Sequence, residues 1–292
     1  MQDVIRQKGE AAMNKERSDA IKQKIAFEIR DFIKRNSGAA SSSGISTIWG
    51  VPLVGFADAA HPYILALKNI ISPSHSIPTD VLDDASIILA YYVPFTKELA
   101  KTNSKNNRLA SPEWALAYEQ TNAMFGELNM HLVEYLISMG YKAAVSKETM
   151  TFDRNKLISN WSHRHFAYAA GLGTFGLNNM LVTKNGCCGR YFTIVTNLDA
   201  EPDKPMIEEL CLYKKNGGCG ICVRNCPIGA LSLSGYDRQK CYSLLRENAE
   251  IYTGFGSSYA DDTDGDGNVK NEGSEVCGKC VTASPCALWN IP

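Results

Sequence analysis

The sequence predicts a mixed α/β (or α+β) fold that ends in a small ferredoxin-like module with two four-iron clusters. Segments typical of strands and of helices alternate up to about residue 205. Beyond that point the chain is rich in turn-forming residues and cysteine. Eight of the ten cysteines lie there, between residues 211 and 286.

The chain divides into three expected parts. Residues 14–35 place apolar side chains at helical spacing, which indicates an amphipathic helix, and residues 37–44 form a serine- and glycine-rich link. We therefore expect an N-terminal helical segment and linker over 1–44. An α/β cofactor-binding domain follows over 45–205, and an iron–sulfur domain over 206–292.

Within the middle part, the apolar run 85–93 predicts a strand covered on both faces. Ser111 suits an N-cap and Pro112 the first turn of a long helix, which should end at Gly140. A short strand is expected over 141–145, a helix over 162–170 and a further strand over 190–197.

Composition restricts the class of partner. The 292 residues are 45% apolar and 21% charged with a net charge of −1, so nothing favours nucleic acid or an anionic membrane. No apolar run is long enough to span a bilayer, and the N-terminus lacks the apolar core of a secretory signal. We expect a cytoplasmic protein of an oxygen-poor organism, whose reduced cysteines bind metal instead of forming disulfides.

The cysteine spacing is typical of two four-iron clusters. A C-x2-C turn places two sulfurs at neighbouring corners of the cube, and a cysteine before proline ligates the other cluster. This crossing-over assigns one cluster to Cys211, Cys219, Cys222 and Cys286, and the other to Cys226, Cys241, Cys277 and Cys280. Zinc, alone or with iron, is the alternative, because it also binds paired C-x2-C motifs. Pro227 suits the start of a short helix over 228–233.

Three glycines, Gly171, Gly173 and Gly176, follow a predicted helix with G-x-G-x-x-G spacing. A dinucleotide fingerprint should follow a strand, so the spacing indicates only a close backbone approach to another element or to a flat cofactor. The run 170–178, a strand ending at residues 196–197 and a cysteine module ending C-x-x-W-N resemble the epoxyqueuosine reductase and reductive dehalogenase superfamily.

The resemblance implies a cobalamin that takes electrons from two four-iron clusters, with reduced ferredoxin or flavodoxin as donor. Its binding residues would be Gly171, Gly173, Gly176, Asn178 and Thr196. This chain departs from the family at Leu177, where a lysine is usual, and at 157–159, where an acidic proton donor is expected and Asp153 is the nearest acid. The family's C-terminal repeat domain does not follow Cys286, so a small organic substrate is expected rather than tRNA.

His163, Arg164 and Tyr168 are the candidate catalytic residues. Histidine is a proton source near neutral pH, arginine can hold a carboxylate or phosphate, and the resemblance implies a tyrosine proton donor. The alternatives are a polar first helical turn capped by Ser162, and simple packing of Tyr168.

Two further motifs carry weaker hypotheses. Adjacent Cys187 and Cys188 cannot pair without strain, so they are free thiols near the cofactor or merely small residues. The acidic run 262–273 resembles the start of a Ca²⁺ loop, but Gly273 stands where the loop needs Glu, so an acidic insertion is the alternative.

Together these features predict an iron–sulfur oxidoreductase that passes electrons through two clusters to a cobalamin, which reduces a small organic substrate. An electron-transfer protein without corrinoid chemistry is the alternative, and a calcium- or redox-sensing regulator is a third hypothesis.

Overall fold

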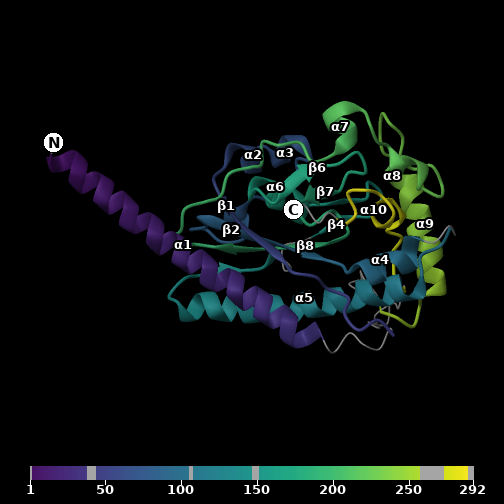
Figure 1. The fold of residues 1–292 in the computed structure, drawn as a ribbon, viewed down its shortest axis with the longest axis horizontal. Helices are drawn as coiled ribbons and strands as arrows, with labels where there is room; N and C mark the ends of the chain where they lie inside the picture. The colour runs from purple at the N-terminus through teal and green to yellow at the C-terminus, as the bar shows by residue number, and fades with distance from the viewer. Residues whose placement is uncertain (1, 38–43, 105–107, 147–150, 257–272, 289–292) are drawn as a thin grey trace.

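The computed structural model describes residues 2–37, 44–104, 108–146, 151–256 and 273–288. At its centre is a four-stranded sheet in the order β1-β2-β8-β3, in which every neighbouring pair is antiparallel (Figure 1). The strands are β1 (Leu53–Asp58), β2 (Ile87–Pro94), β3 (Ala143–Ala144) and β8 (Gly189–Thr196). This is the mixed α/β fold that the sequence predicts, in its α+β form.

Strand β2 is buried along its whole length, as its continuous apolar run predicts. Successive side chains of a strand point to opposite faces. Ile87, Leu89, Tyr91 and Val93 accordingly join one apolar cluster, while Ile88, Ala90 and Tyr92 join another on the opposite face. The sheet therefore has a core on each side.

Helices cover the two faces of the sheet. The long helices α1 (Gln2–Asn36) and α5 (Pro112–Ser138) lie against one face, and α6 (His163–Ala169) lies against the other. Helix α5 begins where the sequence predicts, because the Ser111 hydroxyl accepts the Trp114 N–H at 3.1 Å. It ends before Gly140, whose φ of +88° is left-handed.

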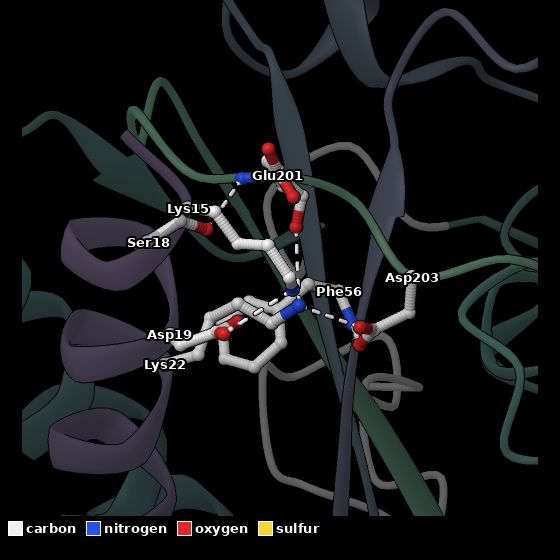
Figure 2. Close-up of polar contacts among 7 residues, drawn as sticks. All are labelled: Lys15, Ser18, Asp19, Lys22, Phe56, Glu201 and Asp203. Carbon is white, nitrogen blue, oxygen red and sulfur yellow. Dashed lines mark hydrogen bonds and ion pairs between the residues drawn. The ribbon is translucent and has the colours of Figure 1, made fainter. Parts of the chain in front are cut away.

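The first half of α1 projects away from the rest of the chain, and its second half lies against the other elements (Figure 1). The Lys22 ammonium bonds to the Asp203 carboxylate and to the Glu201 carbonyl oxygen, and Ser18 Oγ accepts the Glu201 N–H at 2.7 Å (Figure 2). Asp203 also accepts the Phe56 N–H at 2.9 Å. The segment 201–203 thus connects α1 to the edge strand β1.

The remaining elements are short, apart from α9. Two small antiparallel pairs of strands come before and after α6 in the chain, and the described residues of the predicted iron–sulfur part form helices joined by long connections. These remaining elements are α2 (Pro62–Leu65), α3 (Leu67–Ile70), the 3-10 helix η2 (Pro78–Asp80), α4 (Lys97–Ser104), β4 (Phe152–Asp153), β5 (Ile158–Ser159), β6 (Gly173–Phe175), β7 (Leu181–Thr183), α7 (Leu212–Asn216), α8 (Ile221–Arg224), α9 (Arg238–Ile251) and α10 (Lys279–Thr282). Among the described helices, none is both long and apolar enough to cross a membrane.

One predicted element is wrong. Residues 228–233 do not form a helix: they make a turn, closed by a bridge between Leu231 and Tyr236. Gly229 has a φ of +61°, and the Ala230 N–H donates to Cys226 Sγ at 3.1 Å. In a helix starting at Pro227, the Ala230 N–H would donate to a backbone carbonyl. Here it donates to a cysteine sulfur instead.

Candidate metal centre

Four cysteines predicted to share one cluster line a single cavity. They reach it from separate elements: Cys211 is the N-cap of α7, Cys222 lies in α8, and Cys219 and Cys286 lie on loops. Much of the remaining wall is formed by Gly176, Leu177 and Asn178 and by the loop residues Ser284 and Pro285.

The thiols of this first set lie close enough to influence one another. Burial raises the pKa of Cys222 to about 11, and Cys286, Cys211 and Cys219 add to the shift because neighbouring negative charge disfavours a thiolate. The Leu177 N–H donates to Cys211 Sγ at 3.4 Å, and Ser284 Oγ lies 3.3 Å from Cys286 Sγ. Donors therefore already face two of the four sulfurs.

The other four cysteines form a second set beside the first. Burial raises the pKa of Cys277 to about 11 and that of Cys280 well above its ordinary value. Cys241 and Cys226 raise both pKa values further, so these four thiols are mutual neighbours. Cys222 also raises the pKa of Cys280, which places the two sets next to each other.

The donors in both sets are cysteine sulfurs, which four-iron clusters and zinc both bind. All ten cysteines are free thiols. Within the described ranges, no three His, Cys, Asp or Glu side chains converge closely enough to hold one metal ion. A zinc site needs its sulfurs about 2.3 Å from one ion, whereas each sulfur of a four-iron cluster binds a different iron. Both the clusters and their ligand assignment therefore stay predictions, with zinc as the alternative.

The three glycines of the G-x-G-x-x-G run pack against protein. A Cβ on Gly171 would overlap the Lys204 carbonyl, and one on Gly173 would overlap the Val182 carbonyl. At Gly176 a Cβ would lie 3.0 Å from the Val182 side chain. The space that these glycines leave is therefore filled by backbone and side chains, and their contact with cobalamin remains a prediction.

The other two residues predicted to bind cobalamin differ from each other. Asn178 is buried between the cysteines, and its amide donates to Cys187 Sγ at 3.7 Å and to the Cys280 carbonyl at 3.3 Å. Thr196 is buried at the other end of β8, where its hydroxyl donates to the Lys142 carbonyl at 2.7 Å. Asn178 thus lies at the cysteine sets, whereas the Thr196 hydroxyl already has a partner in the sheet.

His163 is held as a neutral ring. Its Nδ1 lies 2.8 Å from Thr193 Oγ1, and its ring stacks on Phe192 at 4.3 Å. Burial, then the positive charges of Arg190 and Arg164, lower its pKa to about 3. This shift disfavours the protonated imidazole, and the role of His163 as a proton source stays a prediction.

Arg164 and Tyr168 contact residues outside α6. Arg164 donates to the Asn179 carbonyl at 2.5 Å and to Met180 Sδ at 3.3 Å. The ring of Tyr168 packs against those of Tyr63 and Phe175, with centroids 4.8 and 5.9 Å apart. Packing, the alternative for Tyr168, is therefore what the structure provides, and its role as a proton donor stays untested.

Cys187 and Cys188 are fully buried immediately before β8. Their N–H groups donate to the carbonyls of Cys286 and Ala287, at 2.8 and 3.0 Å. Cys187 Sγ lies 3.9 Å from Cys286 Sγ. These residues were expected near a cofactor or as small residues, and they lie beside a predicted cluster ligand.

Sequence reasoning missed a second cavity, of about 150 Å³, next to Cys241. Tyr236, Tyr242 and Glu275 are among the residues that line it. The nearly buried Glu275 carboxylate accepts the Tyr242 hydroxyl and an Arg246 N–H, both at 2.9 Å. Burial and a hydrogen bond to Cys241 raise the pKa of Tyr236. Their short distance in sequence from Cys241 and Cys277 was the only available signal.

Of two weaker candidates, one lies in an exposed turn and the other falls almost entirely outside the described residues. The exposed Asp153 closes a turn, because its carboxylate accepts the N–H groups of Lys156 and Asn155, which lower its pKa. The acidic run 262–273, predicted as a possible Ca²⁺ loop, lies outside the described residues except for Gly273.

The cysteine module and the run before it can be set beside known proteins. The chain is similar to epoxyqueuosine reductases. The curated epoxyqueuosine reductase of Bacillus cereus is 28% identical over 180 residues, which cover 58% of this chain and 42% of that protein. The resemblance predicted from the sequence is confirmed by this relative, although the chain spans less than half of its length.

Solved structures of epoxyqueuosine reductases and of a reductive dehalogenase also align with this chain, at low sequence identity. Epoxyqueuosine reductase from Bacillus subtilis aligns with 20% identity and a TM-score of 0.49, over 89% of this chain and 66% of that one. The enzyme from Streptococcus thermophilus aligns with 17% identity and a TM-score of 0.49, over 87% and 65%. A catabolic reductive dehalogenase aligns with 17% identity and a TM-score of 0.40, over 62% and 23%. No family model matches the chain.

Proposed function

We propose that this protein is an iron–sulfur reductase that carries two adjacent four-iron clusters. Cys211, Cys219, Cys222 and Cys286 would hold the first, and Cys226, Cys241, Cys277 and Cys280 the second. The observation that carries the proposal is the grouping of eight buried or half-buried thiols into two neighbouring sets of four. The similarity to an epoxyqueuosine reductase supports the reductase assignment.

The clusters would supply one-electron carriers, and the chain supplies their setting. The N–H groups of Leu177 and Ala230 donate to the sulfurs of Cys211 and Cys226, one in each set. Such donors stabilise negative charge on sulfur. Leu177 therefore acts through its backbone at a position where the related enzymes usually carry lysine.

The second cavity is the place we propose for a small substrate. Its wall includes Cys241, so a molecule bound there would lie beside the second cluster. Its volume of about 150 Å³ is below the roughly 300–1,000 Å³ of most small-molecule sites, which suits a small substrate or one reactive part of a larger one. The exposed guanidinium of Arg238 lies at this cavity and could hold an anionic group.

Cobalamin enters this proposal only through the related enzymes. Of the residues expected to hold it, Gly171 and Gly173 are packed against backbone carbonyls, whereas Gly176 and Asn178 line the first cavity. This packing favours the second candidate function, electron transfer through the clusters without corrinoid chemistry. A reduced ferredoxin or flavodoxin is the proposed electron donor in either case.

Anaerobic purification with iron and sulfide analysis tests the cluster proposal. The wild type should show a broad visible absorption band that bleaches with dithionite, and Cys222→Ala should lose iron. Cys188→Ala is a matched control, because Cys188 is equally buried but belongs to neither set. A colourless protein that holds only zinc would refute the proposal. Adding hydroxocobalamin then separates the two functions: a bound corrinoid spectrum supports the cobalamin reductase, and its absence supports electron transfer alone.

A further inference from the structure

We infer that Cys187 tunes the reduction potential of the first cluster, by donating its S–H to the ligand sulfur of Cys286. This inference rests on the proposed function, because it needs a cluster bound to Cys286. It gives a role to one of the two cysteines that the eight-ligand scheme does not use.

The backbone holds the two sulfurs at a fixed separation. The Cys187 N–H donates to the Cys286 carbonyl at 2.8 Å, and the Cys188 N–H donates to the Ala287 carbonyl at 3.0 Å. Gly186 has a φ of +85°, and a Cβ there would overlap the Ala287 carbonyl. The two segments can approach this closely only because residue 186 is glycine.

Between these segments, Cys187 Sγ lies 3.9 Å from Cys286 Sγ. When both cysteines are free thiols, either sulfur can donate this hydrogen bond. A cysteine that ligates iron is a thiolate and has no proton to give. The proton of this contact therefore belongs to Cys187 once Cys286 binds a cluster.

A second contact orients that proton. The Asn178 amide donates to Cys187 Sγ at 3.7 Å, which occupies a lone pair of the sulfur and leaves its S–H for Cys286. The same amide donates to the carbonyl of Cys280, a predicted ligand of the second cluster. Asn178 and Cys187 are both buried, so water does not compete for these bonds.

The effect on the cluster has a definite sign. Reduction adds negative charge to the cluster and its sulfurs, and a hydrogen bond to a ligand sulfur stabilises that charge. Removing the Cys187 donor should therefore shift the potential of the first cluster to a more negative value. Cys188 is equally buried, and within the described residues its thiol makes no hydrogen bond to a predicted ligand sulfur, so its removal should cause no such shift.

The test is an anaerobic redox titration of the full chain, followed by electron paramagnetic resonance. Cys187→Ala should make one of the two potentials more negative and leave the other unchanged. Cys187→Ser, which keeps a donor, should restore much of the shift, and Cys188→Ala should match the wild type. If the alanine variant assembles no clusters, Cys187→Val gives the same readout, because it also lacks a donor and fills more of the space.

The outcomes separate the two proposals. Two clusters with unchanged potentials in Cys187→Ala, or in Cys187→Val where that variant is needed, overturn this inference alone. A wild type without clusters overturns the proposed function, and the inference with it. An equal shift in Cys188→Ala overturns the inference, because it attributes the change to general loosening of the strand.

Discussion

Replacing Gly186 by alanine should loosen the segment that carries Cys286. The left-handed φ of +85° at this position costs an L residue about 1–2 kcal/mol. The new Cβ would overlap the Ala287 carbonyl, which has to retreat by about 1 Å to reach contact distance. That retreat breaks the hydrogen bond from the Cys188 N–H, with a loss of about 1 kcal/mol.

Together these terms predict that Gly186→Ala lowers the free energy of unfolding by about 2–3 kcal/mol. Anaerobic urea denaturation measures this loss, and iron analysis measures its effect on the site. Because Cys286 belongs to the first set, the iron content should fall from about eight toward about four atoms per chain.

Gly140→Ala is the matched control for this experiment. Gly140 has nearly the same backbone, with φ of +88°, but nothing lies within 4 Å of the position of its Cβ. Its replacement should cost only the backbone term of about 1–2 kcal/mol and leave the iron content unchanged. If both variants lose the same stability and keep the same iron, close approach at Gly186 does not hold the Cys286 segment and the reasoning fails.

Three further predictions concern the body of the fold. Ser111→Ala removes the N-cap of α5, which accepts the Trp114 N–H, and should cost about 1 kcal/mol in thermal or urea unfolding; no change would mean that the cap contributes nothing. Thr121→Val leaves the buried Trp49 indole N–H without its 2.9 Å partner and should cost about 1–3 kcal/mol, whereas Thr121→Ser should cost less. Because burial lowers the pKa of His163 to about 3 from an ordinary 6.5, the unfolded chain binds this proton first. Stability should therefore fall as the pH drops from 6.5 toward 3, with a smaller slope in His163→Gln, and equal slopes would contradict the assignment.

The elements that the sequence predicts well are those with local signals. The Ser111-Pro112 start of α5, its end at Gly140 and the apolar run of β2 are each readable within a few residues. The same is true of the C-x2-C turns. The helix expected over 228–233 failed because a cysteine sulfur, not a local carbonyl, takes the Ala230 N–H.

The glycine run shows the limit of sequence reasoning about the site. Its spacing indicates that something bulky comes close, but the partner at Gly171 is the Lys204 carbonyl and the partner at Gly173 is that of Val182. Neither partner lies in the motif, so only the folded chain distinguishes packing from a cofactor. His163 likewise has a pKa near 3 only because the fold buries it beside two arginines.

By itself, the sequence predicted two interleaved sets of four cysteines, because cluster ligation imposes short spacings that can be recognised along the chain. Only the tertiary structure decided what surrounds those sets. Cys187 and Cys286 are 99 residues apart, yet their sulfurs are 3.9 Å apart. Contacts of this kind depend on how the sheet places distant segments side by side, and no local pattern of residues records that placement.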